Sequence, residues 1–118
     1  MQARMKEKLG EAGIDVSAAL ERFMGNEALL ERFLKKFLND ASYEKLVAAI
    51  DAEQQEDALA AAHTLKGVSG NLAMTELFAL LTEQVAAFRA NDWDKAVKLM
   101  PEISKNYEMI SAAISALE

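Results

Sequence analysis

His63 is the only histidine of the chain, and it lies in the segment 62–70, which reads AHTLKGVSG. Residues three, four and seven positions apart lie on one face of an α-helix. If this segment is helical, the imidazole of His63 shares a face with the ammonium group of Lys66 and with two residues that have no side chain, Gly67 and Gly70. Each glycine inside a helix costs about 1 kcal/mol relative to alanine. The arrangement indicates a nucleophile that a bulky partner must approach closely.

Most other kinds of chemical site are excluded. The chain has no cysteine, which removes disulfides, thiolate metal ligands and cysteine nucleophiles. One histidine without cysteine gives at most a weak carboxylate–histidine site, so no metal site is predicted. No serine nucleophile elbow is present, and segment 67–70 lacks the spacing of a phosphate-binding loop. What remains is a single nucleophile that accepts a group delivered by another protein.

A phosphoryl group fits this nucleophile. A cation one helical turn away would stabilise the negative charge of a phosphoryl group in transfer to the imidazole. Small residues nearby would let a donor protein place its own active site over the ring. The alternative interpretation is an ordinary surface histidine, a solvated lysine and two glycines at a helix contact. The combination on one outward face favours the phosphoryl acceptor.

The composition is that of a folded helical domain. Hydrophobic residues make up 52% of the 118 residues, with one proline and five glycines. The formal net charge of −6 leaves no basic surface of the kind that nucleic acids or anionic membranes attract. No apolar stretch approaches the ~18 residues needed to cross a bilayer, and no apolar segment typical of a signal peptide follows the N-terminal charges. We therefore expect a cytoplasmic protein that binds neither nucleic acid nor membrane.

The hydrophobic pattern predicts only helices. Residues 1–12 are expected to form a charged, partly frayed lead-in, and residues 13–118 the folded domain. Capping residues indicate where two helices begin: Asp15 or Ser17 for the first, and Asn26 for the second. The predicted helices cover about 15–24, 27–38, 43–50, 55–72, 75–90 and 93–116, where 43–50 either continues the preceding helix or begins a new one, and Pro101 kinks or restarts the last. These elements predict an all-α protein, an antiparallel up-and-down four-helix bundle with an additional short N-terminal helix.

Helical periodicity also predicts which side chains are buried. The second helix carries a broad apolar stripe that is expected to face the core, formed by Leu29, Leu30, Phe33, Leu34, Phe37 and Leu38. In the helix over 55–72, the core stripe runs through Ala58, Leu65 and Leu72, so that His63 should be exposed. Leu59, one turn before His63, should be an exposed apolar residue that a docking partner contacts.

The segment HTLKGVS over 63–69 resembles the H-x-L-K-G-x-[SA] signature of histidine-containing phosphotransfer (HPt) domains. The resemblance extends over roughly residues 13–116. It includes an N-terminal pattern over 13–37, the turn and helix start over 71–77, and Asp92-Trp93 at the start of the final helix.

The resemblance implies roles for individual residues. His63 would be phosphorylated, at Nε2, Lys66 would be the supporting cation, and Gly67 would give the partner access. The chain departs from the family at Ala73, where many members have glycine, a conservative change in the turn after the histidine helix. Some members also place a glutamine near the histidine; the nearest here is Gln84, for which a solvated surface position is the alternative.

The predicted function is that of a phosphocarrier in a two-component phosphorelay, and not of an enzyme in its own right. His63 would accept the phosphoryl group from the aspartate of a response-regulator receiver domain, which a hybrid histidine kinase could carry, and pass it to another receiver. No cofactor of its own is expected, since the receiver brings Mg²⁺. A monomer is expected, and Met1 favours a free-standing protein. The alternative is a helical docking or adaptor module that binds a receiver or a histidine kinase without carrying phosphate.

Overall fold

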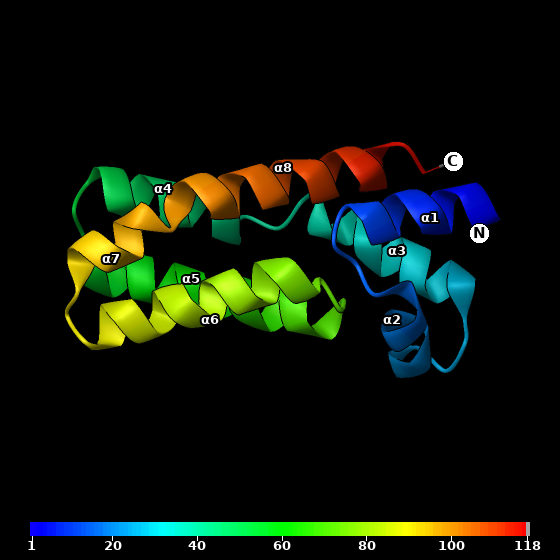
Figure 1. Cartoon of the computed structure of the whole chain (residues 1–118), viewed down its shortest axis with the longest axis horizontal. Helices are drawn as coiled ribbons and strands as arrows, with labels where there is room; N and C mark the ends of the chain where they lie inside the picture. The colour runs from blue at the N-terminus through cyan, green and yellow to red at the C-terminus, as the bar shows by residue number, and fades with distance from the viewer. Residues whose placement is uncertain (118) are drawn as a thin grey trace.

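Eight helices make up the part of the chain that the structure, a computed structural model, describes, which is residues 1–117 (Figure 1). In chain order they are α1 (Ala3–Glu11), α2 (Val16–Arg22), α3 (Glu27–Phe37), α4 (Ser42–Asp51), α5 (Gln55–Asn71), α6 (Thr75–Arg89), α7 (Trp93–Lys98) and α8 (Met100–Ser115). The prediction of an all-α bundle is confirmed. Segment 42–51 is a new helix, and Pro101 lies in the first turn of α8, where a proline needs no hydrogen-bond partner for its nitrogen.

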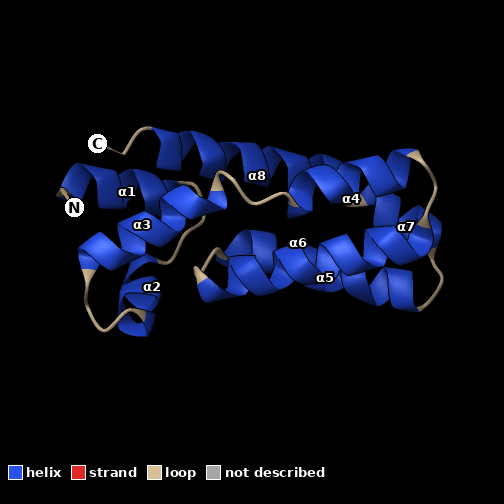
Figure 2. Cartoon of the chain, turned by 180° about the vertical axis from the view of Figure 1, so that it is seen from behind, coloured by secondary structure: helices blue, strands red, loops and turns tan. Residues whose placement is uncertain are grey.

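Helices α4, α5, α6 and α8 lie side by side, and the chain reverses direction from each to the next (Figure 1). Short turns join α4 to α5 and α5 to α6, while α7 leads from α6 into α8. Helices α1, α2 and α3 gather at the end of the bundle where α5 ends and α6 begins (Figure 2). The histidine helix is therefore flanked by α4 and α6 along its length and by the N-terminal helices at its C-terminal end.

Polar side chains set where three of the helices begin. Asp15 accepts a hydrogen bond from the Ala18 backbone N–H at 3.1 Å, Asn26 accepts from Leu29 at 3.0 Å, and Asp92 accepts from Lys95 at 3.2 Å. Each satisfies a backbone donor that the first helical turn leaves without a partner. The capping predictions for Asp15 and Asn26 are confirmed, and Ser17 lies inside α2.

The expectation of a partly frayed lead-in over residues 1–12 is wrong. Ala3–Glu11 forms helix α1, which lies along the C-terminal part of α8 (Figure 1), and the Leu9 side chain is fully buried. The terminal ammonium of Met1 forms an ion pair with the Glu27 carboxylate at 2.8 Å. The segment has three lysine and arginine residues, which suggested a solvated lead-in. Its apolar face is formed by Met1, Met5, Leu9 and Ala12, which recur every three or four residues.

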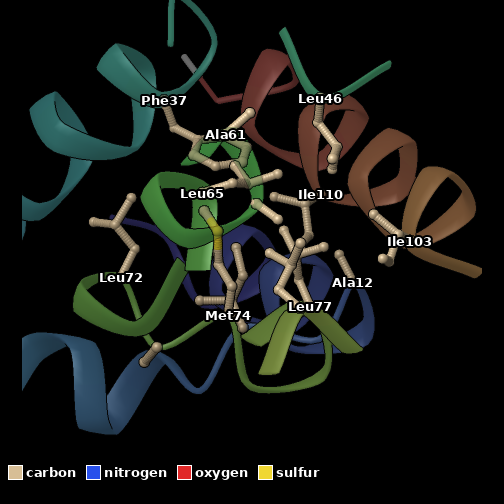
Figure 3. Packing of buried hydrophobic residues seen from close by; sticks show 14 of the residues in the cluster. Ala12, Phe37, Leu46, Ala61, Leu65, Leu72, Met74, Leu77, Ile103 and Ile110 are labelled. Carbon is tan, nitrogen blue, oxygen red and sulfur yellow. The ribbon is translucent and has the colours of Figure 1, made fainter. Parts of the chain in front are cut away.

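The core is formed by side chains from all eight helices and from the turns that adjoin them. Figure 3 shows Phe37, Leu46, Leu65, Leu77 and Ile110 converging around Met74, and each of these side chains is buried. Met74 lies in the turn between α5 and α6, so this turn is part of the packed interior. The end of the histidine helix is thereby fixed.

Two backbone hydrogen bonds tie the turn after α5 to the turn before α2. The N–H of Asp15 donates to the Ala73 carbonyl at 2.8 Å, and the N–H of Thr75 donates to the Gly13 carbonyl at 3.1 Å. Ala73 has a φ of 54°, in the left-handed region that glycine adopts without strain. This explains why a glycine suits the position, which alanine occupies here.

Only part of the apolar stripe of α3 faces the core. Leu30, Leu34 and Phe37 are buried as expected, but Phe33 is 39% exposed and Leu38 is 37% exposed. Helix α3 packs on α8 but lies beyond the ends of α5 and α6 (Figure 1), so fewer neighbours cover it. The expectation that the whole stripe faces a core is therefore wrong, and apolar surface remains at this end of the molecule.

Candidate functional site

His63 projects from the middle of α5 into solvent. On the opposite side of this helix, Ala58, Ala62 and Leu65 are buried against the neighbouring helices. These three residues follow helical spacing, and His63 falls outside their arc. The predicted exposure of the imidazole is confirmed.

Gly67, one turn after His63, borders open space. A Cβ atom placed on Gly67 would have no heavy atom within 4 Å apart from its own helix. Packing inside the chain therefore does not require a glycine here. The bare backbone leaves room beside the imidazole, which fits the predicted role of Gly67 in giving a partner access.

Gly70 has a different environment. A Cβ atom on Gly70 would lie 3.0 Å from two ring carbons of Phe78 on α6, which is tighter than most such contacts. The Arg22 guanidinium also donates a hydrogen bond to the Gly70 carbonyl oxygen. Gly70 is thus a site of close contact between helices, and its prediction as a partner-docking residue on an outer face is corrected. Periodicity within α5 gave no information on where the Phe78 ring of the neighbouring helix would lie.

The ammonium group of Lys66 lies beside an aromatic ring. Lys66 is half-buried, and its Nζ lies 5.9 Å from the centroid of the Phe78 ring. Within residues 1–117, the ion pairs within 4 Å involve other cations: the N-terminus, Lys6 and Lys35. The positive charge of Lys66, one turn from the imidazole, is therefore not neutralised by a carboxylate of the described chain.

Two of the remaining sequence predictions require correction. Leu59 is half-buried and packs against the core, so it is not the exposed apolar residue that was expected. Gln84 is fully buried, and its amide donates to the Ala96 carbonyl oxygen at 3.1 Å and to the Met100 sulfur at 3.1 Å. It therefore faces α7 and α8, which contradicts both a position near His63 and a solvated one.

The burial of Gln84 could have been predicted from the spacing of apolar residues in α6. Leu77, Leu81, Gln84 and Phe88 follow one another at intervals of three or four residues, and all four are buried. A glutamine in such a series belongs to the apolar face, whatever its polarity suggests.

An apolar groove that the sequence interpretation missed lies between α2, α3 and the C-terminal half of α5. It encloses about 560 Å³ and has three phenylalanines in its lining, Phe23, Phe33 and Phe37. Val68 and Leu72 of α5 form part of its wall, five and nine residues beyond His63. This corresponds to roughly 7–14 Å along the helix axis, and both residues lie on the side of α5 away from the imidazole. The sequence did contain a signal for this groove. The apolar stripe of α3 is wider than a helix with one covered face needs.

The groove has a largely cationic rim. Arg22 and Lys36 border it together with one carboxylate, that of Asp40. The Lys36 Nζ also lies 5.0 Å from the Phe33 ring centroid. Two positive charges beside exposed aromatic rings contrast with the formal net charge of −6 of the whole chain.

The described residues contain no cluster of three or more histidine, cysteine, aspartate or glutamate side chains placed to hold a metal ion. Across residues 1–117, every helix is too short or too polar for a membrane span. The chemically relevant features of the His63 face are the exposed imidazole, the ammonium group of Lys66 and the open space over Gly67.

Comparison with known proteins gives one match. The family model described as "Hpt domain" matches residues 28–113, from the start of α3 to the last turns of α8, and the matched range includes His63. Neither the curated proteins nor the solved structures give a significant match. Hpt domains act in histidine phosphotransfer in two-component signalling, as phosphocarriers that interact with receiver domains. The resemblance inferred from the residues around His63 is confirmed.

Proposed function

The chain belongs to the Hpt domain family, and we propose that it accepts a phosphoryl group on His63 from the aspartyl phosphate of one receiver domain and passes it to a second receiver. The observation that carries this proposal is the combination of three features on α5. The imidazole of His63 is exposed, Lys66 lies one turn away outside the ion pairs of the described chain, and the space over Gly67 is open.

The transfer step is an in-line displacement at phosphorus. The lone pair of Nε2 of His63 attacks as the bond between phosphorus and the aspartate oxygen breaks, and the electrons of that bond return to the aspartate carboxylate. The proton on Nδ1 stays in place, so that no base is needed on this chain. Lys66 stabilises the phosphoryl oxygens as charge shifts between donor and acceptor. The reverse displacement passes the group on.

The partner supplies what this chain lacks. Mg²⁺ and acidic residues belong to the receiver domain, and this chain provides no cofactor and is not an enzyme in its own right.

The receiver docks over the His63 face and extends toward the groove. Gly67 leaves the approach to the imidazole free, while Phe23 and Phe33 offer apolar surface to a helix of the partner. Arg22 and Lys36 at the rim suit a partner whose active site is acidic. Receivers of response regulators or of hybrid kinases both fit this description. We expect the protein to work in the cytoplasm as a monomer.

The test is phosphoryl transfer from a phosphorylated receiver to the wild type and to His63→Gln. We expect acid-labile, base-stable label on the wild type and none on His63→Gln, with unchanged helical circular dichroism because the site is exposed. Binding of the receiver to both proteins without label on either would instead indicate the docking or adaptor module. Loss of helicity in His63→Gln would mean that the imidazole is structural.

A further inference from the structure

Phe78 of α6 is one of the few large apolar side chains that remain substantially exposed, at 39%. Its ring contacts two residues of the His63 face of α5. The ring carbons lie where a Cβ atom on Gly70 would come within 3.0 Å, and the ring centroid lies 5.9 Å from the Lys66 Nζ. The exposed ring thus rests on a bare patch of the neighbouring helix and reaches the lysine beside it.

We propose that Phe78 is a positioning residue for phosphoryl transfer. Its ring holds the ammonium group of Lys66 at the edge of the His63 face, and Gly70 provides the space in which the ring lies. The inference rests on the proposed function, in which Lys66 stabilises the phosphoryl group. The inference adds Phe78, a residue of α6, which positions the ammonium group of Lys66 before the receiver binds.

An aromatic ring suits this purpose better than a carboxylate. Lysine carries its charge on a flexible four-carbon side chain. A neighbouring group must restrain this side chain if the ammonium is to be held in position before transfer. A carboxylate would restrain it but would also cancel the charge that the phosphoryl oxygens need. A cation–π contact attracts the ammonium through the ring quadrupole and leaves its full charge in place.

The Gly70–Phe78 contact makes this arrangement possible. A Cβ atom on Gly70 would require the ring to shift by a few tenths of an ångström, and a longer side chain would push it away from α5 and therefore away from Lys66. This gives the second glycine of the motif a function, although the helical wheel alone predicted a different one. Gly67 keeps the approach to the imidazole open, and Gly70 admits the ring that supports the cation.

The first measurement is independent of activity. The side-chain methylene protons of Lys66 should show an upfield ring-current shift in the NMR spectrum of the wild type. We expect this shift to persist in Phe78→Tyr, which keeps the aromatic face, and to vanish in Phe78→Leu. Lys66 protons at ordinary positions in the wild type would overturn the proposal, whether or not the protein carries phosphate.

The second measurement is a double-mutant cycle on the transfer rate. Phe78→Leu should lower the maximal rate of transfer from a phosphorylated receiver about two- to fivefold, the range of a cation–π contact at an exposed site. The receiver concentration at half-maximal rate should stay the same. Phe78→Tyr should transfer at close to the wild-type rate, and Phe78→Leu should cause no further loss in a Lys66→Met background.

Each other outcome has a distinct meaning. An equal loss from Phe78→Leu with and without Lys66 would overturn the proposal, as would an equal loss in Phe78→Tyr. A change confined to the half-maximal receiver concentration would make Phe78 a docking residue and also overturn it. If the wild type accepts no phosphoryl group, the proposed function fails, and the ring-current measurement still decides whether Phe78 holds Lys66.

Discussion

Gly67 and Gly70 lie three residues apart on the same face of α5, yet they serve opposite purposes. The space over Gly67 is open, whereas the space over Gly70 is filled by the ring of Phe78. Both glycines carry the same cost in helix stability. The half of the face around Gly67 is open, and the half around Gly70 is closed by another part of the same chain. A glycine in a helix therefore indicates a close approach without indicating what approaches.

Among the variants that test this comparison, Gly67→Leu is expected to have the largest effect on phosphoryl transfer. The new side chain would stand in the open space beside His63 and hold the receiver away from the imidazole. A misplacement of about 1 Å costs on the order of 100-fold in rate, so we expect phosphoryl transfer to slow by about 100-fold. The free energy of unfolding should rise by up to about 1 kcal/mol, because leucine favours helix more than glycine does.

Initial transfer rates and urea unfolding of the same preparations check this prediction. Ala112→Leu on α8 is the matched control, since it places the same side chain at another exposed helical position. A wild-type transfer rate in Gly67→Leu would show that the open half of the face is not the approach route.

Gly70→Leu is expected to act on stability first. Its side chain must displace the Phe78 ring, and overpacking of this kind costs about 1–3 kcal/mol, which exceeds the gain in helix propensity. Urea unfolding should therefore give opposite signs for the two leucine variants. If Gly70→Leu is as stable as Gly67→Leu, the distinction between the closed and open halves is wrong.

The smallest effect on transfer is expected from Gln84→Leu, because Gln84 lies on the side of α6 that faces α7 and α8. The change removes the hydrogen bond to the Ala96 carbonyl, but it also removes a buried amide oxygen that has no partner. These effects oppose each other, so the free energy of unfolding should change by less than about 1 kcal/mol. The transfer rate should equal that of the wild type, and a large loss of transfer would place Gln84 back in the functional site.

The sequence predicted those features that depend on one helix at a time. The exposure of His63 and the caps at Asp15 and Asn26 follow from helical periodicity and from hydrogen-bonding chemistry within a few residues. The position of Lys66 one turn from His63 is of the same kind.

The features that the sequence interpretation missed depend on contacts between helices. The contact between Gly70 and Phe78 joins α5 to α6, and the burial of Gln84 results from the packing of α7 and α8 on α6. The groove beside Phe33 exists because α3 extends past the ends of α5 and α6. Periodicity fixes which residues share a face, but not which neighbour covers that face or where it ends.

The most direct test of the central claim uses the fact that His63 is the only histidine. Protein with ¹⁵N-labelled imidazole is mixed with a phosphorylated receiver, and the two ring nitrogens are followed by NMR. The account predicts a new imidazole signal in which Nε2 is coupled to phosphorus, and its decay when a second, unphosphorylated receiver is added. An unchanged imidazole spectrum in the presence of a receiver that binds the protein would contradict the account.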